Sequence, residues 1–273
     1  MSGEINEISL STSVFGKEKG DGFRLSDYVD IAAQAGYKYI ELSRRQWDCQ
    51  DRDFDLIEAS GIKVWSVHGV LGGDAISPDP ELRRKAVDFA YQRALRAARF
   101  APCPLVEHYL DRHSDPEIGR YFRESVAMLY EKVSKLGYIL CIETAPWKPK
   151  LYDRHPDSPE IAEFVRSFGK DDLQMTIDIN HSNLHEDLVD VANNCRGLIK
   201  NIHVSNNNGT WEDHLPPQTG VIDMKRTFDA LRANGYSGPC NLEFRFGEEC
   251  GMPSLELLRD VRLYMEKLLW NRD

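Results

Sequence analysis

The chain has no long apolar segment. In its 273 residues no apolar run approaches the roughly 20 residues that a membrane-spanning helix needs. The first ten residues, MSGEINEISL, have neither the basic start nor the apolar centre of a signal peptide. Low-complexity linkers are absent as well. These absences predict a cytoplasmic protein with no membrane segment, folded as one domain over residues 1–273.

Basic residues are outnumbered. Thirty-four Lys and Arg against 44 Asp and Glu give a net charge of −10. Such a surface repels phosphate backbones, which makes nucleic acid an unfavoured partner. The six cysteines show no CxxC spacing, and several, such as Cys141 in YILCIE, lie in apolar strand-like runs. We therefore expect reduced core residues rather than disulfides or zinc ligands, in agreement with a cytoplasmic location.

Strand-like and helix-like segments alternate along the whole chain. Apolar runs typical of buried strands occupy 5–10, 37–42, 62–67, 105–107, 138–142, 174–177, 198–204 and 241–244. Amphipathic stretches typical of helices occupy 25–34, 54–59, 80–100, 116–136, 158–168, 184–195, 223–233 and 253–270. Eight strand–helix units with short connections predict an α/β fold, a single (β/α)8 TIM barrel.

Nearly every predicted strand ends in a carboxylate or an imidazole. In chain order these residues are Glu41, His68, His108, Glu143, Asp178 with His181, His203 and Glu243. The carboxyl ends of parallel barrel strands form one ring, so these side chains are expected to meet there. Crowded carboxylates repel one another unless a cation neutralises them, and three carboxylates with imidazoles suit a divalent ion. The pattern predicts a metal site.

The segment 198–223, LIKNIHVSNNNGTWEDHLPPQTGVID, carries more polar residues than a core strand and its turn require. Its apolar strand delivers His203, and the loop behind that strand holds Glu212 and His214. A polar loop at this end of a barrel strand indicates a functional site.

Aromatic and basic residues near the strand ends add further candidates. Trp147 follows the fifth strand and either walls a ligand pocket or covers the barrel rim. Arg245, two residues past Glu243, either binds a substrate carboxylate or phosphate or offsets the acidic ring. Tyr264 and Trp270 on the last helix either contact another subunit of a homo-oligomer or pack on the barrel's own outer ring.

The succession of Glu143, Asp178-x-x-His181, His203 and Glu243, with the HLPP…GxID loop, resembles the xylose isomerase-like TIM barrels. That superfamily includes sugar phosphate isomerases and epimerases, ketose 3-epimerases, inosose dehydratases and endonuclease IV. The resemblance covers essentially the whole chain. It is more specific for the superfamily than for the substrate.

The resemblance implies a ligand set and a mechanism. Glu143, Asp178, His203 and Glu243 match the four ligands of one divalent metal in ketose 3-epimerases, for which Mn²⁺ is the preferred candidate and Mg²⁺, Co²⁺ or Zn²⁺ are alternatives. Glu143 and Glu243 would remove and return a proton on opposite faces of a carbon next to a carbonyl, through an enediolate. The expected substrate-binding residues are His181, His68, His108, Glu41, His214, Arg245 and Trp147.

The expected function is therefore a metal-dependent isomerase or epimerase of a sugar, sugar phosphate or polyol. The loop 144–150 lacks the Asn-Arg and Glu of ketose 3-epimerases, and its Lys148 and Lys150 favour a phosphorylated or carboxylated substrate. An inosose-type dehydratase would share the proton abstraction and differ in expelling a β-hydroxyl. A non-catalytic sugar-binding barrel is a further alternative.

An endonuclease IV-like zinc phosphodiesterase acting on abasic DNA is the remaining alternative. The ligand order of its trinuclear site can be followed here, with Glu212 where that family uses Asp. Three features argue against this alternative: Glu41 at the strand end, the negative net charge, and the lack of clusters of basic and aromatic residues that could bind a DNA duplex. The segment 44–47 is the only candidate for such binding. Glu212 and His214 decide the matter: contact with metal would indicate a multinuclear site, whereas contact with substrate or solvent, which we expect, indicates one metal.

Overall fold

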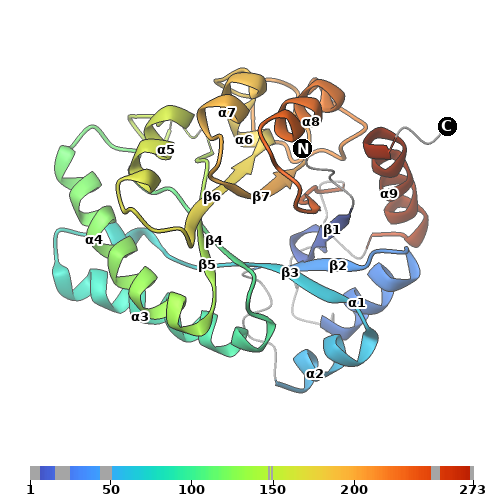
Figure 1. Cartoon of the computed structure of the whole chain (residues 1–273), viewed down its shortest axis with the longest axis horizontal. Coiled ribbons are helices and arrows are strands. Elements are labelled where there is room, and N and C mark those ends of the chain that lie inside the picture. The colour runs from blue at the N-terminus through green and yellow to red at the C-terminus, as the bar shows by residue number, and fades with distance from the viewer. Residues whose placement is uncertain are drawn as a thin grey trace.

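The computed structural model describes residues 7–15, 25–43, 51–146, 148, 150–246 and 253–270. Eight parallel strands close into a barrel in the order β1 to β8, and helices surround it (Figure 1). The strands are β1 (Ile8–Ser11), β2 (Tyr39–Leu42), β3 (Lys63–His68), β4 (Pro104–His108), β5 (Ile139–Glu143), β6 (Leu173–Asp178), β7 (Ile199–Val204) and β8 (Cys240–Leu242). The predicted (β/α)8 TIM barrel is confirmed.

The helices form the outer layer. They are α1 (Leu25–Gln34), α2 (Asp51–Ser60), α3 (Pro80–Arg96), α4 (Pro116–Val133), α5 (Ser158–Arg166), α6 (Ile179–Ser182), α7 (Leu188–Asn194), α8 (Met224–Ala233) and α9 (Leu255–Trp270). The last helix, α9, packs against both α1 and α8 and so closes the ring (Figure 1). Within the described ranges, no helix has the length and apolarity needed to cross a membrane.

The predicted helix over 184–195 is wrong in its first turn. Two helices lie in this region, and each starts at an aspartate whose carboxylate accepts a backbone N–H. Asp178 caps α6, and Asp187 accepts from Val189 N at 2.8 Å to start α7. An N-cap aspartate fixes where a helix can begin. The cap of α6 matters for function because Asp178 is also a predicted metal ligand.

The barrel interior is polar where the site begins. Glu41 of β2 accepts hydrogen bonds from Ser66 of β3 and from His203 of β7, so the three side chains meet inside the barrel. On the same strand Ile40 and Leu42 are buried in the hydrophobic core. Alternation along a strand thus sends apolar side chains toward the helices and polar ones inward. Four cysteines in the described part of the chain, Cys103, Cys141, Cys195 and Cys240, are buried and free, in agreement with the predicted reduced core residues.

A buried carboxylate holds the loop that follows β3. Glu107 of β4 accepts hydrogen bonds from the backbone N–H groups of Val70, at 3.2 Å, and Leu71, at 2.8 Å. Gly69 permits this approach, because a Cβ there would lie 2.0 Å from Glu107 Oε1. The loop starts directly after His68, so this contact fixes the chain beside a site residue. Burial raises the pKa of Glu107 to about 7, although the hydrogen bond from Leu71 opposes the shift.

We expect the Glu107→Gln variant to gain stability relative to the wild type as pH rises from acid to neutral, although its amide nitrogen cannot accept one of the two backbone N–H groups. The folded pKa lies above the unfolded one, so wild-type stability falls as pH rises from about 4.5 to 7. The fall is on the order of 3 kcal/mol. The variant's amide resembles the protonated acid and lacks this loss. Urea unfolding over a pH series measures the difference, and parallel curves for the two proteins would contradict the assignment.

Candidate metal and substrate site

Adjacent strands deliver the predicted ligands to one level of the barrel. The β-sheet register pairs His108 with Glu143 across β4 and β5, and Asp178 with His203 across β6 and β7. Glu243 follows the last residue of β8, and its backbone N–H still donates to Val204 O at 3.0 Å. The strand-end residues therefore meet in space, as a parallel barrel requires.

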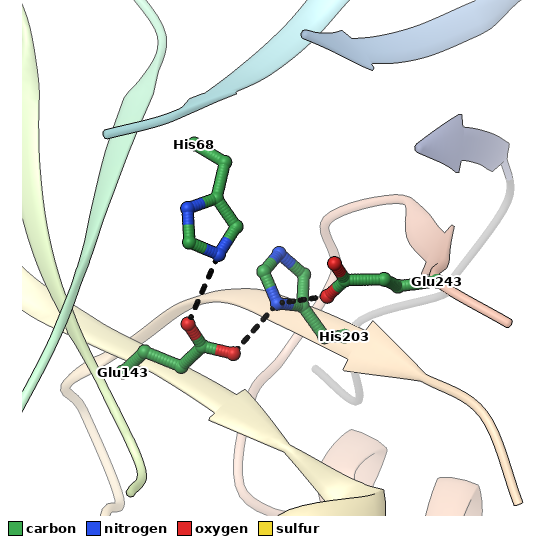
Figure 2. Close-up of side chains that lie close together, drawn as sticks. All are labelled: His68, Glu143, His203 and Glu243. Atoms are coloured by element: carbon green, nitrogen blue, oxygen red, sulfur yellow. Dashed lines mark hydrogen bonds and ion pairs between the residues drawn. The ribbon is translucent and has the colours of Figure 1, made fainter. Parts of the chain in front are cut away.

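Four of these side chains form a compact group, which we call the primary cluster: His68, Glu143, His203 and Glu243. Each offers a ligand atom within 4.8 Å of the others. His203 Nδ1 lies 2.8 Å from Glu143 Oε1 and 3.0 Å from Glu243 Oε2, and His68 Nε2 lies 3.4 Å from Glu143 Oε2 (Figure 2). Two carboxylates and two imidazoles facing one point are a donor set suited to a divalent ion.

The carboxylates of the primary cluster favour positive charge on His203 and also on His68. Against the opposing effect of burial, they raise the pKa of His68 to about 9. Burial alone would lower the pKa of His203, but the charges of Glu41, Glu143 and Glu243 hold that pKa well above its usual range. Burial alone would raise the pKa of Glu143, but the charges of His203 and His108 hold it well below. An imidazolium surrounded by carboxylates is thus favoured in the metal-free protein. A bound metal would displace the proton on Nδ1.

Asp178 joins the primary cluster through Glu143. Its Oδ1 accepts from the backbone N–H groups of Asn180 and His181, at 2.8 and 3.0 Å. Its Oδ2 is buried without a hydrogen-bond partner, and Glu143, Asp178 and His181 form a second group of potential ligands. Burial, followed by the charge of Glu143, raises the pKa of Asp178 well above its usual range. An orphaned buried carboxylate oxygen is costly unless a cation is bound, so the residues fit a metal.

His181, Glu212 and His214 form a third group of potential ligands, which we call the acceptor cluster. His181 Nδ1 lies 3.1 Å from Thr144 O, and His214 Nδ1 lies 3.1 Å from Glu243 O. A carbonyl oxygen only accepts, so both Nδ1 atoms carry the proton and both Nε2 atoms present lone pairs. Burial lowers the pKa of each ring, which keeps both imidazoles neutral.

The acceptor cluster already has a cationic neighbour. Lys148 Nζ lies 3.0 Å from Glu212 Oε1, and Glu212 Oε2 lies 3.5 Å from His181 Nε2. Lys148, the acceptor cluster, His68, His108, Glu243 and Arg245 line one pocket. Glu212 and His214 therefore face the same space as the primary cluster. The lysine already provides a positive charge beside Glu212, which lowers the need for a second metal ion there.

Several residues that shape the site carry no strand-end signal. Asn206 Oδ1 accepts from the N–H groups of Asn207 and Ile222, at 2.9 Å each, and so folds the loop that presents Glu212 and His214. Gly220, at φ +91°, is required because a Cβ would lie 2.5 Å from Asn207 O. The run of three asparagines, 206–208, is the only signal that the sequence offered for this role.

One predicted substrate-binding residue does not line the pocket, and another lies outside the described residues. Glu41 is fully buried behind His203 and does not line the pocket, so its position does not support the expected substrate contact. Trp147, like the segment 44–47, lies outside the described residues. Ser13 and Ser43, which sequence reasoning missed, line the pocket next to Arg245.

Known proteins resemble the chain in overall sequence and in fold. The L-ribulose-5-phosphate 3-epimerase UlaE of Escherichia coli O1:K1 is 23% identical over 253 residues, and the match covers 85% of each chain. A solved L-ribulose 3-epimerase superposes with a TM-score of 0.81 at 18% identity, covering 97% of this chain and 95% of that one. The D-allulose 3-epimerase of Methylomonas sp., solved in complex with D-allulose, gives 0.80 at 16% identity, covering 98% and 99%.

The family model described as xylose isomerase-like TIM barrel matches residues 29–268. That span contains every residue of the primary and acceptor clusters and runs from α1 into α9. The chain belongs to the xylose isomerase-like TIM barrel family.

Proposed function

We propose that the protein is a divalent-metal-dependent sugar epimerase or isomerase. It would remove a proton from a carbon next to a carbonyl and return it, through an enediolate. The observation that carries the proposal is the pair of carboxylates, Glu143 and Glu243, which approach His203 Nδ1 from β5 and from the end of β8 at 2.8 and 3.0 Å. The relatives named as 3-epimerases of ribulose, ribulose 5-phosphate and allulose favour the same chemistry.

Glu143, Asp178, His203 and Glu243 are the proposed metal ligands, with Mn²⁺ the preferred ion. A divalent ion held by them would supply positive charge beside the substrate oxygen that becomes negative as the proton leaves. Three observations support this set: the closeness of Glu143, His203 and Glu243, the link of Asp178 to Glu143, and the orphaned Asp178 Oδ2.

Proton transfer would fall to the two glutamates. Burial alone would raise the pKa of Glu243, but the neighbouring His203 charge lowers it, and Glu143 behaves in the same way. Both groups are therefore ionised and can accept a proton. Glu243 lines the pocket, whereas Glu143 lies beneath His68 and His108, which contact its Oε2 at 3.4 and 3.1 Å. The two carboxylates thus come from different strands and different depths, and the scheme assigns one of them to each face of the carbon.

The acceptor cluster suits a polyhydroxylated substrate. Its two neutral Nε2 atoms and the Glu212 carboxylate only accept hydrogen bonds, and the hydroxyl groups of a sugar donate them. Arg245 lies exposed at the rim of the same pocket, where it would meet a phosphate on the far end of the substrate. His181, His214 and Arg245 are therefore the proposed substrate contacts.

Incubation of the Mn²⁺-loaded protein with candidate sugars in D₂O tests the proposal. L-ribulose, D-allulose and L-ribulose 5-phosphate make up the first panel. We expect one deuterium at the carbon that is epimerised, detected by NMR, together with the second epimer. An inosose that loses water instead would indicate the dehydratase alternative. A protein that binds the metal and exchanges no proton in any of these compounds or in other ketoses would contradict the proposal.

A further inference from the structure

The side chain of Glu41 reaches a metal-ligand histidine and not the substrate pocket. Its Oε2 lies 2.9 Å from His203 Nε2 and accepts the Ser66 hydroxyl at 2.7 Å. Glu41, Ser66 and His203 are all fully buried. Two donors from β3 and β7 therefore hold one carboxylate oxygen of β2 in place.

This contact decides which nitrogen of His203 keeps its proton when a metal displaces the other one. An ionised carboxylate only accepts hydrogen bonds, so Nε2 must be the protonated atom. Nδ1, which faces Glu143 and Glu243 at 2.8 and 3.0 Å, is then the atom that can offer a lone pair to a cation. The same contact fixes the plane of the ring, because Glu41 holds Nε2 while Glu143 holds Nδ1 on the other side of the ring. Figure 2 shows the contacts of Nδ1.

We propose that Glu41 is a positioning residue that holds His203 in the Nε2–H tautomer and directs Nδ1 toward the metal. A carboxylate behind a metal-bound histidine also makes the imidazole a stronger ligand. Burial of Glu41 is costly, and the hydrogen bonds to Ser66 and His203 offset that cost. This inference rests on the metal site of the proposed function and goes beyond it by assigning a role to a residue outside the ligand set.

Metal binding by the Glu41→Gln variant tests the assignment. Gln has nearly the shape of Glu but lacks the charge, and its amide group can turn to donate to Nε2, which would move the proton to Nδ1. We expect the Kd for Co²⁺, followed by visible absorption, to rise about ten- to a hundredfold. The matched control is Glu186→Gln, which neutralises a half-buried carboxylate that holds Ser158 at the start of α5 and should leave the Kd for Co²⁺ unchanged. Ser66→Ala, which removes only one partner of Glu41, should give a smaller rise.

A measurement on the wild type tests the assignment even if the Glu41→Gln variant fails to fold. In the Zn²⁺-loaded protein, ¹⁵N NMR of the histidine rings should show His203 protonated at Nε2 and metal-bound at Nδ1. The assignment would be overturned if the Glu41→Gln variant bound Co²⁺ with the wild-type Kd. It would also be overturned if His203 of the wild type bound the metal through Nε2. Either result would leave the proposed function intact. A wild type that binds no Co²⁺ or Zn²⁺ would overturn both.

Discussion

The Glu143→Gln and Glu243→Gln variants are each expected to lose epimerisation. Each should also lose exchange of the substrate proton with solvent from the epimer that its own carboxylate deprotonates. The reason is that each carboxylate is a proposed base on one face of the carbon, and an amide cannot accept the proton. General acid–base groups typically contribute about 10²- to 10⁴-fold, so the rate of deuterium uptake should fall at least a hundredfold. The measurement is deuterium uptake by NMR, starting separately from each of the two epimers.

Two controls separate loss of a base from loss of the fold or of the metal. Circular dichroism and the Tm of each variant report the fold, and elemental analysis reports the bound metal. Glu186→Gln serves as the matched variant, because Glu186 is also a partly buried glutamate but its carboxylate accepts from Ser158 at the start of α5. Full epimerisation activity in either glutamine variant would rule out the scheme with two bases.

Removal of the metal is expected to abolish activity and to lower the Tm, and one equivalent of Mn²⁺ per chain should restore both. The crowded carboxylates of the primary cluster repel one another less when a cation lies between them. At a free metal concentration of about 100 Kd, binding adds roughly 2.7 kcal/mol to the free energy of unfolding. Dialysis against a chelator, then elemental analysis and thermal unfolding, measures this effect.

The affinity for metal should rise with pH. The metal must displace the proton that the carboxylates hold on His203 Nδ1, and the pKa of that imidazole lies well above its usual range. Protons therefore compete with the metal throughout the neutral range, and the apparent Kd should fall as pH increases. A Kd that is constant between pH 6 and 9 would contradict this account.

The metal count also separates the proposed function from the nuclease alternative. The pairing of Lys148 with Glu212 favours one ion per chain, because an ammonium group already neutralises part of the acceptor cluster. Three tightly bound ions per chain, together with cleavage of abasic DNA, would support the phosphodiesterase instead. The same titration that restores activity gives this number.

The fold followed from local patterns. Apolar runs, helix-ending glycines and short connections suffice to count eight strand–helix units, because hydrophobic periodicity and turn residues act over a few positions. The strand ends were predicted within a few residues. The predicted start of the helix over 184–195 was wrong, because an aspartate cap fixes where that helix begins. The convergence of Glu143, Asp178, His203 and Glu243 also followed, since parallel barrel strands place all their carboxyl ends at one mouth.

The sequence by itself thus determined which groups gather at the mouth of the barrel, and only the tertiary structure decided what each one does. Glu41 was expected at the substrate, yet its side chain crosses the interior to His203, a residue 162 positions away. The carbonyl groups of Thr144 and Glu243 determine which ring nitrogen of His181 and of His214 carries the proton. These roles depend on distances between strands far apart in the chain, and a one-dimensional pattern holds no information about them.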